Sequence, residues 1–380
     1  MIKKRLIYIS SPYSSVFSSQ VIEYLKELKK KDFFSEIILL VGIRKKNDIK
    51  LVPLEECSEF KVLFFKRYAN YSLYKRIQQI ELAKTLNKLL EDNTIVHVRT
   101  ESLSRALYPI IKKSHHTNIK LIADVRGAVY EETLLYKKLK PVLFQLKLQQ
   151  HKKNLKSLGK NTDAISCVSS RLKEYIIERT AIEKDSVFVN HCLAGKNFSY
   201  SEKIRKEYRD KMGIKEKEVL FLFSSGGDAN WQNTTSTISN IADKGYKILN
   251  LSRQNIEQKN VINLFVPYNE VPKYLNAVDI AVIWRKNDIV NNVASPVKFS
   301  EYVCLGLPVI ANDGVCLINE YIDKTKFGKI INNFDEINDD LISELLKSDR
   351  KEISDHAFNH FSYNAILDQY LLIYKNCITQ

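Results

Sequence analysis

The sequence has no apolar run of the roughly 18 to 20 residues that a membrane-spanning helix requires, which argues against an integral membrane protein. It also has no Cys-x-x-Cys pair, and the adjacent His115 and His116 have no cysteine near them. The six scattered cysteines therefore fit reduced, buried thiols better than a zinc site. The start, MIKKRLIYISSPYSS, contains only a short apolar run and favours a first β-strand over a secretion signal. We expect a cytoplasmic protein.

Acidic residues are scarce in one half of the chain. Through Asn190 the sequence has 36 Lys and Arg against 20 Asp and Glu, whereas the remainder has 23 against 24. This asymmetry predicts a polyanionic partner for the first half, either nucleic acid or an anionic membrane surface. The stretch from Lys137 to Lys160 has eight lysines and no acid. It fits a basic helix lying on an anionic bilayer, or a core-packed helix whose lysines face solvent.

The chain is long for one domain, and one pattern occurs in it twice. Short β-branched runs alternate with segments of helical periodicity, the alternation pauses around HCLAGKNFSY, and a second series begins at EVLFLFSSGG. Buried strands that alternate with helices predict parallel sheets covered on both faces. We therefore expect an α/β protein with two Rossmann-like domains, residues 1–192 and 193–360. Because ligands of such sheets bind beyond the carboxyl ends of the strands, both domains should face one cleft.

Small and charged residues follow two predicted strands of the second domain. One strand runs into Gly226 and Gly227, where backbone N–H groups can approach a phosphate at the start of the next helix. A plain turn explains these glycines as well. Another strand ends at Arg285, which can pair with a diphosphate or be an ordinary surface charge.

The segment SPVKFSEY predicts the opening of a helix that faces a ligand. Ser295 fits an N-cap and Pro296 the first helical position. Lys298 in the first turn opposes the helix dipole, so its placement favours a site shared with an anion. Glu301 lies on the same side and can accept hydrogen bonds from two ribose hydroxyls. A surface Lys–Glu pair is the alternative, but it does not explain the following Gly-Leu-Pro, residues 306–308.

The fifty residues from Val266 to Val315 carry a more specific pattern. They contain, in order, Asp279 at a presumed strand end, Ser-Pro-x-Lys, Glu-Tyr, Gly-Leu-Pro and an apolar strand. This segment resembles the donor-binding segment of retaining GT-B glycosyltransferases of the family-4 type, especially those that assemble bacterial surface polysaccharides. Weaker agreement in SSGGDANWQN, CVSSRLKEYI and LIADVRGAVYEE extends it over nearly the whole chain. The resemblance implies the GT-B fold, with a C-terminal helix, residues 361–380, packing back on the first domain.

In that family the glutamate corresponding to Glu301 holds the nucleotide ribose, and glycine-rich and basic loops hold the diphosphate. The resemblance thus implies catalytic charge stabilisation by Lys298 and Arg285. It implies a donor site formed by Glu301, Gly226, Gly227, Ser295, Gly306 and Pro308.

The sequence departs from the family pattern in two places. Many relatives have a first glutamate eight residues before the second, and here that position is Val293. The Arg…Lys phosphate pair that usually follows the first strand of the second domain is also missing from SSGGDANWQN. Other groups must therefore contact the donor, which makes Arg285 and Lys298 stronger candidates.

The first domain carries weaker signals. ADVRGAVYEE puts Asp124 and Arg126 at a strand end and Glu131 at the start of the basic helical region. The resemblance implies that Arg126 faces the transferring sugar or diphosphate, and that an acid such as Asp124 or Glu131 contacts acceptor hydroxyls. Acids that complement a helix N-terminus are the alternative. Ser14 and Ser15 follow the first strand, where relatives often have a glycine-rich acceptor loop; a plain loop fits as well.

The resemblance implies a mechanism without a protein nucleophile, in which the leaving diphosphate accepts the acceptor's proton. The protein positions the substrates and stabilises negative charge on the diphosphate. The resemblance implies no metal or other cofactor, and the sequence contains no Asp-x-Asp motif. We predict transfer of a hexose-like residue from a nucleotide-sugar donor to a lipid-linked saccharide acceptor in O-antigen or capsule-type synthesis. The enzyme would work at the inner face of the cytoplasmic membrane, with its basic half toward the anionic lipid.

Three alternatives fit less well. A sugar-nucleotide 2-epimerase of the same fold gives no reason for the basic first half. A non-catalytic nucleic-acid-binding protein predicts basic and aromatic residues in both halves, whereas the second half is neutral, so we expect no nucleic acid partner. A two-domain sugar receptor would require a secretion signal.

Overall fold

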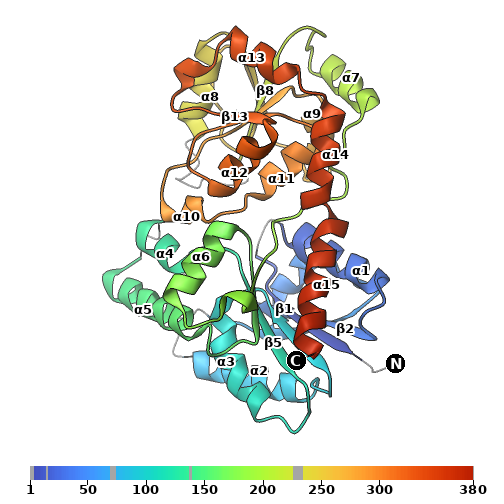
Figure 1. Ribbon diagram of the computed structural model, residues 1–380, viewed down its shortest axis with the longest axis vertical. Helices are drawn as coiled ribbons and strands as arrows, with labels where there is room; N and C mark the ends of the chain where they lie inside the picture. Colours follow the sequence, from blue (N-terminus) through green and yellow to red (C-terminus); the bar gives the residue numbers. More distant parts are fainter. Residues whose placement is uncertain (1–3, 14–15, 69–73, 137–138, 226–233, 380) are drawn as a thin grey trace. The chain divides into compact units, whose positions relative to one another are not determined.

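The computed structural model describes residues 4–13, 16–68, 74–136, 139–225 and 234–379. The chain forms two compact units: unit 1 consists of Met1–His191 and Ile366–Gln380, and unit 2 of Cys192–Ala365. Each unit is a sheet flanked by helices (Figure 1). The predicted α/β class with two Rossmann-like domains is therefore confirmed.

Unit 1 contains a seven-stranded sheet in the order β3-β2-β1-β4-β5-β6-β7, in which all neighbouring strands are parallel. The five inner strands are almost wholly buried, as expected for a sheet covered on both faces, whereas the edge strands β3 and β7 are partly exposed. Their bounds are β1 Arg5–Ser10, β2 Glu36–Ile43, β3 Lys61–Lys66, β4 Thr94–Val98, β5 Lys120–Val125, β6 Ala164–Cys167 and β7 Val187–Val189.

The helices of unit 1 connect successive strands of this sheet. They are α1 Glu23–Lys30, α2 Lys75–Asn87, α3 Glu101–Lys112, α4 Val129–Tyr136, α5 Pro141–Ser157 and α6 Ser170–Arg179, with short π or 3-10 turns at Ser18–Ile22, Lys46–Leu51, Leu54–Cys57 and Lys184–Ser186. The basic stretch from Lys137 to Lys160 is not one helix, because α5 begins at Pro141 after Lys140, an extended residue. A proline at the first helical position starts a helix and cannot continue the preceding one. Glu131 consequently belongs to a separate helix, α4.

The C-terminal helix, α15 Tyr363–Thr379, belongs to unit 1 from Ile366 onwards. It lies beside α1 (Figure 1), where the hydroxyls of Tyr24 and Tyr374 are 2.8 Å apart. The Tyr374 hydroxyl is also 2.7 Å from Nδ1 of His97, a fully buried residue of β4. Burial lowers the pKa of His97 to about 4, so this histidine is a neutral core residue near pH 7.

Unit 2 contains a six-stranded parallel sheet in the order β10-β9-β8-β11-β12-β13. Its strands are β8 Leu220–Ser224, β9 Lys247–Leu251, β10 Val261–Leu264, β11 Ile280–Ile283, β12 Val309–Ala311 and β13 Gly328–Ile330. Its helices are α7 Glu202–Lys211, α8 Thr234–Asp243, α9 Val271–Asn276, α10 Ile289–Asn292, α11 Val297–Cys304, α12 Cys316–Thr325, α13 Asp339–Leu346 and α14 Arg350–Phe361, with a 3-10 turn at Phe334–Glu336. Two apolar clusters, one on each side of this sheet, form the core.

Candidate functional site

The carboxyl ends of β8 and β11 lie at the centre of the unit 2 sheet, where the two strands pair. Ser224 is the last residue of β8, and Arg285 follows β11 by two positions. Helix α11 brings Lys298 and Tyr302 to the same place: the Tyr302 and Ser224 hydroxyls are 2.7 Å apart. A hollow of about 10 Å³ separates these groups. It is lined by Phe223, Ser224, Val282, Ile283, Trp284, Arg285, Lys298 and Tyr302.

Lys298 is held at this edge by a neutral partner. Its ammonium donates a hydrogen bond of 2.5 Å to the backbone carbonyl of Ser224. Burial, together with the positive charge of Arg285, lowers the pKa of Lys298 to about 7, although the carboxylate of Glu301 opposes the shift. A partly desolvated ammonium beside another cation is costly to keep charged, and an anion bound there would stabilise it.

Arg285 is fixed through its backbone. Its N–H donates to the side chain of Asn312 (3.0 Å), and its carbonyl accepts from the same amide group (2.6 Å). Gly314 permits this close approach, because a Cβ there would lie 2.7 Å from the Arg285 carbonyl oxygen. Burial lowers the pKa of the guanidinium to about 10, and no described carboxylate forms an ion pair with it. Arg285 thus leaves its donor groups available to an anion such as a phosphate.

Glu301 lies one turn further along α11 and is 5% exposed. Its Oε1 accepts a 2.7 Å hydrogen bond from the hydroxyl of Tyr268, a residue that the sequence analysis did not identify. Burial raises the pKa of Glu301 to about 7, although this hydrogen bond and the charge of Lys298 oppose the shift. Two oppositely charged groups whose pKa values both lie near 7 are typical of a functional site.

The predicted start of α11 is wrong by one residue. The helix begins at Val297, and Pro296, not Ser295, is its N-cap, without any side-chain hydrogen bond. The Ser295 hydroxyl instead accepts a 3.0 Å hydrogen bond from the backbone N–H of Cys192. Ser295 therefore anchors the chain that leads into α11 and is not available as a cap.

Gly306 and Pro308 do not lie at the donor site as predicted. Gly306 ends α11 with φ +72°, and the N–H groups of Gly306 and Leu307 donate to the carbonyls of Val303 and Tyr302, a Schellman motif. Since the eight residues of α11 span about 12 Å, this end is far from Lys298. Pro308 precedes β12, so it lies at the amino edge of the sheet, opposite the ligand edge.

Asp279, predicted at the end of a strand, precedes β11 and lies at the amino edge too. Its carboxylate pairs with Arg205 at 2.5 Å and Arg209 at 3.0 Å and accepts the N–H of Leu220 at 2.8 Å. These contacts join α7 to the starts of β8 and β11. The role of Asp279 is therefore structural.

In unit 1, Asp124 ends up buried beneath Arg126 and Arg99. Its Oδ2 is 3.6 Å from Nη1 of each arginine, and its side chain is wholly inaccessible. Burial acts to raise the pKa of Asp124, but the two positive charges outweigh it and hold the pKa below its usual value. Arg126 also donates to Gln20 at 3.3 Å. Asp124 therefore positions Arg126 and does not itself reach a ligand.

Glu131 accepts a hydrogen bond from the Tyr175 hydroxyl and lies 3.7 Å from Arg179, so its carboxylate is already engaged.

The sequence analysis missed Glu101, which begins α3 directly after the N-cap Thr100. Burial raises the pKa of Glu101 to about 7, and the negative charges of Glu132 and Glu131 add to the shift. The sequence signal that could have identified Glu101 was its position shortly after the predicted strand IVHVR. Four further predicted residues, Ser14, Ser15, Gly226 and Gly227, lie outside the described part of the chain.

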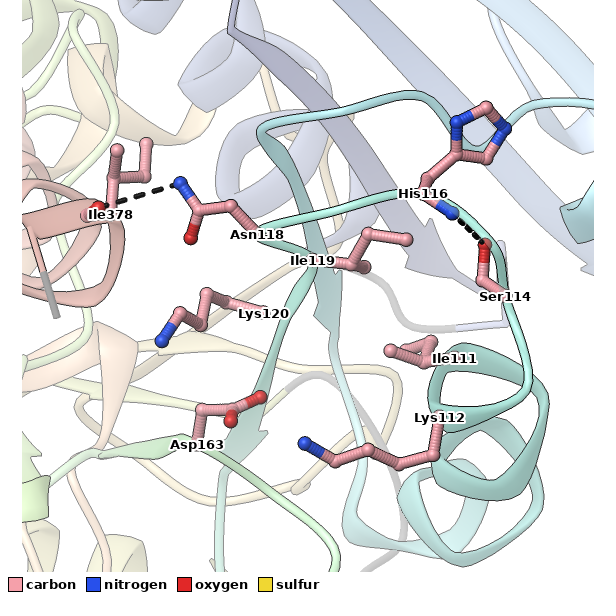
Figure 2. Close-up of a pocket in the computed structure, with 9 residues that line it drawn as sticks. All are labelled: Ile111, Lys112, Ser114, His116, Asn118, Ile119, Lys120, Asp163 and Ile378. Atoms are coloured by element: carbon pink, nitrogen blue, oxygen red, sulfur yellow. Dashed lines mark hydrogen bonds between the residues drawn. The ribbon is translucent and has the colours of Figure 1, made fainter.

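A larger hollow, of about 600 Å³, lies at the opposite edge of the unit 1 sheet (Figure 2). Lys120, the first residue of β5, and Asp163, which precedes β6, both line it. Asn118 donates there to the carbonyl of Ile378 at 3.4 Å (Figure 2). Ligands of parallel α/β sheets bind at the carboxyl ends of the strands, whereas this hollow lies at their amino ends. We therefore do not assign the hollow as the substrate site, despite its size.

The whole chain is similar to solved glycosyltransferase structures. A glycosyltransferase from Rickettsia africae ESF-5 has 14% sequence identity and a TM-score of 0.70, covering 100% of both chains. Anabaena Alr3699/HepE, solved in complex with UDP and glucose, has 9% identity and a TM-score of 0.70 over 98% of this chain and 100% of its own. WaaG, a glycosyltransferase involved in lipopolysaccharide biosynthesis, has 13% identity and a TM-score of 0.60 over 98% of each.

These similarities show that the chain has the GT-B fold of glycosyltransferases. No protein-family model matches the chain, and no curated protein matches it in sequence.

Proposed function

We propose that the protein is a retaining glycosyltransferase that moves a sugar from a nucleotide diphosphate sugar to a lipid-linked saccharide in bacterial surface polysaccharide synthesis. The observation that carries the proposal is the pair of buried cations, Lys298 and Arg285, beside Glu301 at the carboxyl edge of the unit 2 sheet. A structure of HepE, which shares the fold, was solved in complex with UDP-glucose. The family-4 resemblance of the segment around α11 supports retention.

The residues of the site divide the work on the donor. Arg285 and Lys298 hold the diphosphate and stabilise the negative charge that grows on it as the glycosidic bond breaks. Glu301, oriented by Tyr268, accepts hydrogen bonds from the ribose hydroxyls. The hollow of about 10 Å³ has room for about one water molecule and is too small for a nucleotide. The nucleotide therefore lies across its opening. We propose that this chemistry needs no metal, because the two cations supply the positive charge.

The acceptor part of the proposal rests on unit 1. Arg126, held by Asp124 and Gln20, lies at the carboxyl edge of that sheet, where a ligand of the unit would bind. Glu101 follows β4 near Glu131 and can accept hydrogen bonds from acceptor hydroxyls.

The membrane part rests on the surface formed by α4 and α5, two helices that pack together and lie side by side in Figure 1. This α4–α5 surface exposes a cluster of large apolar side chains between lysines. They range from 37% to 73% exposed and are Leu134, Leu135, Leu139, Val142 and Leu146. No helix of the described residues is long and apolar enough to cross a membrane. We propose a peripheral enzyme on the inner face of the cytoplasmic membrane, with leucines entering the bilayer and lysines meeting anionic headgroups.

Vesicle sedimentation tests the membrane contact. Val142→Ser with Leu146→Ser should release the protein from phosphatidylglycerol vesicles, because each removes exposed apolar area from α5. Leu372→Ser, which changes a leucine 55% exposed on α15, is the matched control and should bind as the wild type does. Equal binding of all three proteins would exclude this surface.

A thermal-shift panel of UDP, GDP, ADP, TDP and CMP tests the donor site. One nucleotide should stabilise the wild type, by roughly 2.7 kcal/mol at a hundred times its dissociation constant, and should fail to stabilise Glu301→Ala. Glu320→Ala, at an exposed glutamate of α12, is the control and should respond like the wild type. Without a shift from any nucleotide, or with equal shifts in all three proteins, the proposed function is rejected.

A further inference from the structure

Three neighbouring strands of unit 1 end together beside a group of polar and basic residues. β1, β2 and β3 are parallel, and the register pairs Ile43 with Lys66 at the ends of β2 and β3. The residues that follow the three strands are Ser11, Arg44 and Arg67, at the same edge of the sheet. This is the edge at which parallel α/β sheets bind ligands.

Arg67 is turned inward at this edge. Its backbone N–H continues the sheet by donating to the carbonyl of Ile43 (2.8 Å), and its Nη1 donates to the Ser11 hydroxyl. Burial lowers the pKa of Arg67, and the positive charge of Arg44 lowers it further. A half-buried guanidinium whose protein partner is a neutral hydroxyl retains most of its five N–H donors for another group.

Arg44 lies over the ring of Tyr13, with 4.5 Å between its guanidinium carbon and the ring centre. The nearby carboxylate of Asp48 is committed elsewhere. Its Oδ2 accepts the Tyr13 hydroxyl at 2.6 Å and the backbone N–H of Lys45 at 2.8 Å. Asp48 therefore orders the turn after β2 and leaves the Arg44 guanidinium free to bind a second group.

No described carboxylate pairs with either guanidinium. The two neighbouring segments that the structure does not describe, residues 14–15 and 69–73, contain no acidic residue in the sequence. Lys45, Lys46 and Lys66 add further positive charge. Two neighbouring arginines, of which Arg44 lowers the pKa of Arg67, form a site without a neutralising acid that an anion would stabilise.

We propose that Arg67 and Arg44, together with Ser11, bind a phosphate or diphosphate ester in unit 1. Planar guanidinium groups suit phosphate because each can donate two parallel hydrogen bonds to it. Identification of this ester as the diphosphate of the lipid-linked acceptor rests on the proposed function. A phospholipid headgroup or a free phosphorylated molecule presents the same chemistry.

Calorimetric titration with inorganic pyrophosphate tests the site. All proteins carry Arg285→Gln, so that the unit 2 guanidinium does not contribute to the comparison. Arg67→Gln and Arg44→Gln should each weaken binding roughly tenfold to a hundredfold, the loss expected for a hydrogen bond between charged groups. Lys61→Gln removes the same charge from the start of β3, at the opposite edge, and should bind as the parent does. Arg44 is exposed, so its variant keeps the test valid if Arg67→Gln does not fold.

The source of the phosphate is resolved by two further probes, nanodiscs that contain a polyprenyl diphosphate and nanodiscs that contain phosphatidylglycerol, each in neutral lipid. Binding that depends on Arg44 and Arg67 with any of the three probes supports the site, and the probe that binds most tightly names the source. Binding that is independent of both arginines for all three probes, that Lys61→Gln weakens equally, or that is absent throughout overturns it.

This test is independent of the nucleotide panel. If the panel fails and pyrophosphate binding still requires Arg44 and Arg67, the phosphate site stands and the proposed function falls. If the nucleotide stabilises the protein through Glu301 while no probe depends on the two arginines, the proposed function stands and this site falls.

Discussion

Affinity for the nucleotide sugar should fall as the pH rises through about 7, because Lys298 loses its proton there. A lysine with the ordinary pKa of about 10.4 remains charged at pH 9, whereas only about 1% of a group with a pKa near 7 does. If the diphosphate binds the charged form, the dissociation constant rises about tenfold per pH unit above the pKa. Between pH 7 and pH 9 the increase is roughly fiftyfold.

Isothermal titration with the nucleotide sugar measures this effect. The sugar ester is preferable to the free nucleoside diphosphate, because a terminal phosphate monoester itself titrates near pH 6. Repeating each titration in two buffers of different ionisation enthalpy gives the number of protons taken up, which should approach one per ligand above pH 8. Lys298→Met should bind weakly with no alkaline fall, and Lys329→Met, at an exposed lysine of β13, should follow the wild type.

The reasoning is refuted if wild-type affinity stays constant from pH 7 to pH 9, or if binding takes up no proton. In either case Lys298 would remain charged in the free protein despite its burial. The same alkaline fall in Lys298→Met would assign the titration to another group.

Three other perturbations probe the fold and the site. Below pH 7 the affinity of the wild type should fall, because protonated Glu301 has fewer lone pairs for the ribose hydroxyls. Glu301→Gln should not show this fall in affinity. If its affinity still falls below pH 7, Glu301 does not have this role. Gly306→Ala should lower the free energy of unfolding in urea by at least about 1 kcal/mol, since its Cβ would lie 2.1 Å from the Arg350 carbonyl oxygen, yet the folded protein should bind nucleotide normally. Asp124→Asn should lower the free energy of unfolding by roughly 3 to 5 kcal/mol, because it leaves the positive charges of Arg99 and Arg126 without the carboxylate between them. An unchanged urea midpoint would show that the folded state does not need this carboxylate.

The strands could be predicted from the sequence because their pattern is local. EVLFLFSSGG and DIAVIW contain β8 and β11, and Ser225 and Arg285, which follow these strands, lie at the predicted edge of the sheet. Burial on both faces makes each such strand a continuous apolar run, which needs no knowledge of its neighbours. The alternation with helices then fixes parallel pairing, because the chain must cross over between strands.

The positions of Gly306 and Pro308 could not be predicted in the same way. They lie close in sequence to Lys298 and Glu301, but a helix of eight residues separates them in space. Gly306 is required by a left-handed helix end and by the carbonyl of Arg350, a residue more than forty positions away. Tyr268, which orients Glu301, is likewise remote in sequence. Proximity along the chain therefore placed two helix-end and strand-start residues at the donor site and missed Tyr268, the hydrogen-bond partner of Glu301.

The net charge of the sequence does not distinguish exposed cations from buried ones, but the structure does. The many lysines of α5 contribute to the net charge, and most of them lie on or near the surface, where they act as a field on a large anionic partner. Arg285, Lys298 and Arg67 contribute little to the count, but each is desolvated near the carboxyl ends of sheet strands. Arg285 and Arg67 have no ion-pair partner among the described residues, and Lys298 has the carboxylate of Glu301 nearby. Desolvation of an unpaired cation disfavours the folded state unless an anion binds there. We therefore expect a diphosphate to be recognised where cations are few and desolvated, not where lysines are most numerous.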